Sequence, residues 1–149
     1  MSTLHMAERA QPQLNATTIV LRSVVVGLTL VTATIHAQLG GLLFLANAVG
    51  YTTLALAMVA PGPIGQVRWL VRIALFGFTA ATIGGWVLFG ARFQLAYVDK
   101  AVEVVLIAIV AIELWRSDGG PIGVVRQARG LVARLAGRVT GTQAARAAR

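Results

Sequence analysis

The sequence predicts an all-α integral membrane protein. We expect a four-helix bundle with both termini in the cytoplasm, followed by a basic amphipathic helix at the membrane surface. Hydrophobic residues make up 57% of the 149 positions and charged residues only 12%, whereas about 25% of the residues in a soluble domain are charged. In addition, no Asp, Glu, Lys or Arg lies between Arg22 and Arg68, a stretch long enough to cross a hydrocarbon core of about 30 Å twice.

Clusters of Gly and Pro mark the turns between the apolar segments. Gly40 and Gly41 separate the first two segments, and 61–63, with the sequence Pro-Gly-Pro, closes the second. Residues 1–18 lack the pattern of a cleaved signal peptide, so the first span is expected to act as its own insertion signal. The predicted spans are residues 19–37, 42–60, 73–91 and 97–115.

The fourth predicted span is the least apolar. It contains Asp99, Lys100, Glu103 and Glu113. Hydropathy alone would also fit a surface helix, but Lys and Arg accumulate on the cytoplasmic side of a membrane. The loop that holds Arg68 and Arg72 must then share that side with the Arg-rich tail, 116–149, so the chain crosses twice between them. Of the 13 Lys and Arg residues, only Arg92 and Lys100 would lie outside the inner (plasma) membrane.

The sequence of the tail after the fourth span predicts a helix with one apolar side and one basic side. Between 121 and 139 the aliphatic residues fall on one side of a helical wheel, and the other side holds Arg126, Arg129, Arg134 and Arg138. This pattern is typical of a helix that lies on a membrane and contacts anionic lipid. A disordered basic end that contacts RNA or a protein is the alternative. The tail lacks aromatic residues for base stacking, so no nucleic-acid partner is expected.

A row of small residues in the third span, Gly77, Ala81 and Gly85, recurs every four positions. Such rows allow helices to approach closely, so we expect a packing face here. The general abundance of Gly, 16 of 149 residues, explains the row equally well.

Polar residues gather where the predicted topology brings the outer ends of the spans together. The candidate polar site consists of His36, Asn47, Tyr51, Asp99, Lys100 and Glu103. With a rise of about 1.5 Å per residue, Asn47 and Glu103 lie at a similar depth. An acidic residue inside a span is usually turned inward and paired.

Glu103 has two interpretations. In the first it binds a proton or a cation, helped by His36, because imidazole changes charge near neutral pH. In the second it is a structural carboxylate that accepts a hydrogen bond from Asn47 or pairs with Lys100 three residues earlier. The pattern favours the second interpretation, since Glu103 lies near the membrane interface, where a charge is less costly.

Several kinds of chemistry lack support in the sequence. With no Cys, disulfides, thiolate metal sites and covalent c-type haem are excluded. His36 has no histidine neighbour that would suggest haem or metal binding, and the serines lie at the predicted cytoplasmic side, away from it. We therefore expect no cofactor, no metal and no catalytic residue.

Two segments of the chain match a pattern found in other proteins. The segment HAQLGGLLFLANAVGY, from His36 to Tyr51, and the later YVDKAVEV, from Tyr97, resemble a pattern in small four-span bacterial membrane proteins with no known activity. The resemblance covers spans one, two and four. It implies that His36, Asn47, Tyr51 and Glu103 belong together.

Three functions remain open. The leading hypothesis is a non-enzymatic accessory or self-associating subunit, working as a homo-oligomer or in a larger membrane complex through helix packing. The first alternative is a small proton- or cation-coupled transporter that uses the Glu103 carboxylate. The second is a quinone- or lipid-handling component in which His36 and Tyr51 hydrogen-bond a headgroup.

Overall fold

The computed structural model describes residues 16–147 and is helical nearly throughout, without strands in this range. The predicted all-α fold class is therefore confirmed for the described residues. Most of the predicted N-terminal segment, residues 1–18, lies outside them. The helices are α1 (Ala16–Leu39), α2 (Leu42–Val59), α3 (Gly62–Gln66), α4 (Arg68–Phe89), α5 (Gln94–Asp118) and α6 (Gly120–Ala147).

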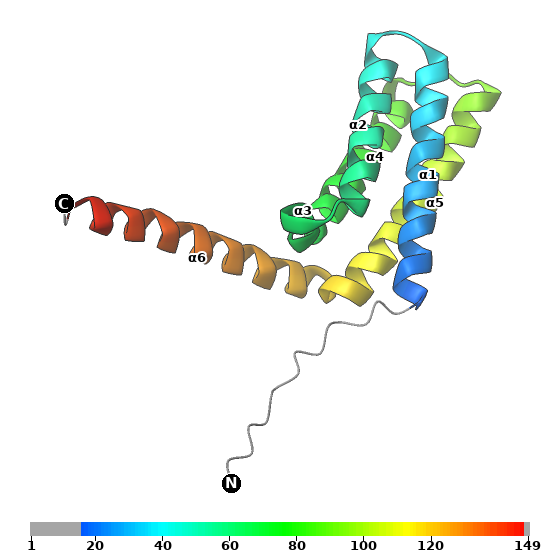
Figure 1. Ribbon diagram of the computed structural model, residues 1–149. Coiled ribbons are helices and arrows are strands. Elements are labelled where there is room, and N and C mark those ends of the chain that lie inside the picture. The colour runs from blue at the N-terminus through cyan, green and yellow to red at the C-terminus, as the bar shows by residue number, and fades with distance from the viewer. Residues whose placement is uncertain (1–15, 148–149) are drawn as a thin grey trace.

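Four long helices, α1, α2, α4 and α5, pack side by side with alternating directions (Figure 1). We call them the core helices. Helix α1 contacts α2 and α5, and α4 contacts the same two, so each of the four has two neighbours. Their shared interior is mainly apolar and contains Val25, Ala33, Tyr51, Met58, Leu75, Leu106 and Val110.

Glycines with positive φ make the sharp connections. Gly40 (φ 69°) and Gly41 (φ 81°) join α1 to α2, and Gly119 (φ 75°) and Gly120 (φ 64°) join α5 to α6. This left-handed region is open to Gly because it has no Cβ. The Gly pair predicted to separate the first two spans thus forms a turn two residues long between antiparallel helices.

Three helices, α1, α2 and α4, are long and apolar enough to cross a membrane. Helix α5 has a different composition because it carries the four charged residues noted above. Those side chains nevertheless point inward: Asp99 and Glu103 are 1% and 0% exposed. Between Tyr97 and Trp115 its exposed side is apolar and holds Tyr97, Val98, Val104, Val105, Ile112 and Trp115.

The chain differs from the predicted spans at the start of α4, which begins at Arg68 rather than at residue 73. Arg72 therefore lies within the helix, not in a loop, and its side chain is buried against α5. The short helix α3 was not predicted. It occupies the Pro-Gly-rich connection between α2 and α4, with Pro63 in its first turn, where the missing N–H of proline is tolerated.

Helix α6 extends away from the core helices, at the end where α5 terminates (Figure 1). Arg126, Arg129 and Arg134 are exposed on it, and so are the apolar side chains of Ile122 and Val132. The side chain of Arg138 lies outside the described part of the chain. Contact of these arginines with anionic lipid remains a prediction.

Candidate functional site

A group of polar side chains is buried at the end of the core helices that holds the α1–α2 turn and the α4–α5 connection. We call it the histidine cluster. All four core helices contribute to it, and its members are Thr32, His36, Tyr51, Thr82, Asp99, Lys100 and Glu103. Repeats at four-residue spacing, Thr32 with His36 and Asp99 with Glu103, place each pair on one helical face.

Glu103 on α5 is fully buried. Its Oε1 accepts a hydrogen bond from the Tyr51 hydroxyl at 2.8 Å and lies 2.9 Å from the Thr82 hydroxyl. Its Oε2 accepts from the Lys100 ammonium at 2.5 Å. Both carboxylate oxygens therefore have donors, as a buried charged group requires.

Asp99 lies one turn earlier on α5 and shares the same ammonium. Its Oδ2 is 3.0 Å from Lys100 Nζ, and its Oδ1 accepts a hydrogen bond from the Thr32 hydroxyl at 2.6 Å. Lys100 thus bridges Asp99 and Glu103. The ion pair between Lys100 and Glu103, suggested by their spacing, is present.

His36 on α1 faces both carboxylates. Its Nδ1 lies 2.9 Å from the backbone oxygen of Thr32, and because a carbonyl oxygen can only accept, Nδ1 carries a hydrogen. Its Nε2 is 3.9 Å from Glu103 Oε1, and its Nδ1 is 3.6 Å from Asp99 Oδ1. Nε2 is therefore the ring atom at which the charge of His36 can change.

The formal charges of the histidine cluster do not cancel when His36 is neutral. Asp99 and Glu103 contribute two negative charges, Lys100 contributes one positive charge, and the cluster is left with one excess negative charge. All four side chains are at most 11% exposed. An uncompensated charge in such surroundings is costly, so one further positive charge is favoured here.

A metal ion bound by the histidine cluster would be one source of this positive charge. His36, Asp99 and Glu103 can each offer one ligand atom within 4.8 Å of the others. The Lys100 ammonium, however, already contacts one oxygen of each carboxylate. The other two oxygens, Asp99 Oδ1 and Glu103 Oε1, accept hydrogen bonds from hydroxyl groups. The residues therefore fit an ion-paired, hydrogen-bonded cluster better than a metal centre.

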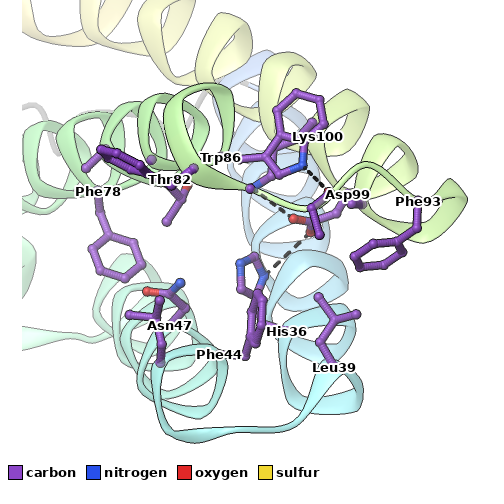
Figure 2. A pocket seen from close by; sticks show the side chains of 17 residues that line it. His36, Leu39, Phe44, Asn47, Phe78, Thr82, Trp86, Phe93, Asp99 and Lys100 are labelled. Atoms are coloured by element: carbon purple, nitrogen blue, oxygen red, sulfur yellow. Dashed lines mark hydrogen bonds and ion pairs between the residues drawn. The ribbon is translucent and has the colours of Figure 1, made fainter.

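An apolar groove of about 430 Å³ adjoins the histidine cluster. Figure 2 shows His36 and Lys100 pointing toward Asp99 at one side of this space, with Asn47 and Phe78 at another. It is lined by His36, Leu39, Leu43, Phe44, Asn47, Phe78, Ala81, Thr82, Gly85, Trp86, Phe89, Gly90, Ala91, Phe93, Ala96, Asp99 and Lys100. Glu103 is absent from this lining and lies behind Asp99 and Lys100.

The structure brings five of the six predicted site residues together and places the sixth, Asn47, apart from them. His36, Tyr51, Asp99, Lys100 and Glu103 lie together in the cluster. Asn47 lines the groove, and in the described part of the chain it donates no hydrogen bond to Glu103. Of the two partners suggested for Glu103, Lys100 is therefore present and Asn47 is not, because the Tyr51 and Thr82 hydroxyls contact Oε1 and the Lys100 ammonium contacts Oε2.

The row Gly77, Ala81 and Gly85 does not bring helices together within the described chain. All three residues are exposed, a Cβ added at Gly77 or Gly85 would have no atom within 4 Å, and Ala81 and Gly85 line the groove. Small side chains there leave room for the groove. Packing of this row against another chain stays a prediction.

The close helix contact lies at Gly50, which the sequence did not single out. A Cβ at Gly50 would lie 2.6 Å from Phe78 Cζ, so only Gly lets this ring approach α2. Phe78 then packs edge-on against Tyr51, with ring centroids 4.8 Å apart. Gly50 therefore helps to position the hydroxyl that binds Glu103.

A second charged group, the arginine cluster, is buried near the opposite end of the core helices. Arg72 Nη2 donates to Glu113 Oε1 at 2.7 Å, and Nη1 donates to Asp118 Oδ2 at 2.9 Å. Arg72 is 4% and Glu113 0% exposed. These bonds tie α4 to the last turns of α5.

Comparison of the chain with protein-family models, with curated proteins and with solved structures found no match.

Proposed function

We propose that this chain is a four-span membrane protein, with both termini in the cytoplasm, that works as a small proton-coupled carrier. In this proposal the histidine cluster lies in the outer half of the membrane and binds and releases one proton at His36 Nε2. The excess negative charge of the cluster is the observation that carries it.

The crossing of α5 is supported by the direction of its charged side chains. Asp99, Lys100, Glu103 and Glu113 are all buried among the other core helices, and the side of α5 that faces away from them is apolar. A charged residue inside a membrane span usually faces the interior of the bundle and is paired. A surface helix would instead show its charges to water.

The position of the proton follows from the partners of each group. Glu103 accepts from Lys100, Tyr51 and Thr82, and Asp99 accepts from Lys100 and Thr32, so donors surround both carboxylates. Helix α4 adds no charged group to these partners. His36 Nε2, which faces Glu103, is the atom left to take a proton and make the cluster neutral.

The convergence of these residues beside a groove favours a carrier over the accessory subunit that the sequence alone suggested. Helix packing alone needs no imidazole beside buried carboxylates. The arginine cluster, which also combines two carboxylates with one cation, has none. The quinone- or lipid-handling alternative shares the groove, and it predicts no proton exchange at His36 in the absence of a redox partner.

Single-cysteine labelling tests the topology, because the chain has no Cys. We expect an impermeant maleimide to label Leu42→Cys, next to the α1–α2 turn, and Arg92→Cys from outside intact cells. Ile64→Cys and Arg129→Cys should react only after permeabilisation. Labelling of Arg129→Cys from outside would contradict the crossing of α5.

Proton uptake after a pH jump tests the exchange. In purified protein taken from high to low pH within the range in which it stays folded, wild type should bind one proton more than His36→Gln. Glu103→Gln, which removes the facing carboxylate, should shift the uptake to lower pH. Equal uptake by wild type and His36→Gln would refute proton binding at His36. His5→Gln, which replaces the other histidine of the chain, is the control.

A further inference from the structure

We propose that the groove binds a lipophilic cation, an organic cation with apolar or aromatic substituents, whose charge takes the place of the proton on His36. The exchange with a proton rests on the proposed function. The selectivity of the groove for a cation rests on the lining residues and can be tested by itself.

The groove is open at the side of the core helices. Ala81 and Gly85 on α4 and Leu43 and Phe44 on α2 line it and are exposed on the surface. If α2 and α4 cross the membrane, this side faces the acyl chains. A ligand that partitions into the bilayer can then reach the groove laterally, whereas a strongly hydrated ion cannot.

Aromatic residues make up much of the groove wall. Rings from α2, from α4 and from the α4–α5 connection line it, namely Phe44, Phe78, Phe89 and Phe93, together with Trp86, one face of which already carries the Arg92 guanidinium. Faces of aromatic rings attract organic cations because the π electrons make them negative. The volume, about 430 Å³, lies within the range of small-molecule pockets, roughly 300–1,000 Å³.

The charge of the ligand follows from the residues at the base of the groove. Asp99, His36 and Lys100 line it together, and Figure 2 shows the three converging there. With His36 neutral, the cluster behind this surface has one excess negative charge. A bound cation compensates it, and a proton on His36 does the same, so the two compete for one charge position. A bound anion would instead increase the excess negative charge.

Two probes of nearly the same shape and opposite charge test the proposal: tetraphenylphosphonium and tetraphenylborate. Binding to purified full-length protein is measured by equilibrium dialysis, corrected for partition into protein-free micelles, while a pH dye records protons in weak buffer. We expect tetraphenylphosphonium to bind and release one proton, and tetraphenylborate to bind at least about tenfold more weakly, a difference of 1.4 kcal/mol.

Asp99→Asn should weaken tetraphenylphosphonium binding at least about tenfold, because it removes the carboxylate that lines the groove. Asp118→Asn is the matched control: it makes the same change in the arginine cluster and should leave the affinity unaltered. The comparison of the two probes on wild type does not depend on whether Asp99→Asn folds.

Equal binding of the two probes, or displacement of tetraphenylphosphonium by Na⁺ or Mg²⁺ at matched ionic strength, would overturn the proposal. If His36 still titrates in that case, the proton-binding function stands without this ligand. If tetraphenylphosphonium binds more tightly than tetraphenylborate but releases no proton, the groove selects cations and the exchange with the proton on His36 is refuted.

Discussion

The two buried charged clusters have similar components and different chemistry. Each combines carboxylates with a cation and ties α5 to the other core helices. In the arginine cluster the cation is Arg72, which stays protonated at any physiological pH and reaches Glu113 and Asp118 through separate nitrogens. The histidine cluster combines Lys100 with His36, whose ring can gain or lose a proton at Nε2.

The surroundings of the two clusters differ as well. The histidine cluster adjoins an apolar groove, and His36, Asp99 and Lys100 reach its surface. The groove contains no member of the arginine cluster. We infer that one cluster is a fixed ionic connection between α4 and α5, whereas the other can change its charge in response to a ligand.

The largest effect on stability is expected for Arg72→Leu. The change leaves Glu113 buried and unpaired, and breaking a buried ion pair costs about 3–5 kcal/mol. Unfolding by titration with SDS, or thermal unfolding in mild detergent, would measure this loss of stability. Arg92→Leu is the control, because Arg92 is exposed and lies over the Trp86 ring. If the two variants were equally stable, the arginine cluster would not be the fixed connection.

A middle-sized effect is expected for Gly50→Ala. The new methyl group would overlap Phe78, and overpacking of this kind costs about 1–3 kcal/mol. Because Phe78 packs on Tyr51, we also expect altered proton binding in the histidine cluster. Gly77→Ala adds the same methyl group where no atom lies within 4 Å. A similar loss of stability in both variants would show that the Phe78 contact is not the cause.

The smallest of the three effects is expected for Tyr51→Phe. It removes one of the donors to Glu103 Oε1, and a buried acceptor that loses a partner costs about 1–3 kcal/mol. The low end applies, since the Thr82 hydroxyl is still within reach. Thermal unfolding compared with Tyr97→Phe, whose ring is exposed, measures the hydroxyl contribution. If the two variants were equally stable, the Tyr51 hydroxyl would not stabilise the histidine cluster.

The helices could be predicted because long apolar stretches and Gly or Pro turns are local signals. The spacing of Asp99 and Glu103 also placed them on one face of a helix. What sequence could not supply is which faces meet: Thr82 and Gly50 belong to residue types scattered along the chain, and their roles arise only when α2 and α4 pack on α5. Arg72 was assigned to a loop because hydropathy does not reveal an inward-facing ion pair.

The central claim is that His36 exchanges a proton within a buried cluster. The chain has two histidines, so in His5→Gln protein labelled with ¹⁵N-histidine, NMR observes the His36 ring alone. We predict that, as the pH falls over the range in which the protein stays folded, the ring changes from a neutral form with hydrogen on Nδ1 to a doubly protonated form, and that Glu103→Gln shifts this change. A ring that keeps one protonation state throughout this range would contradict the account.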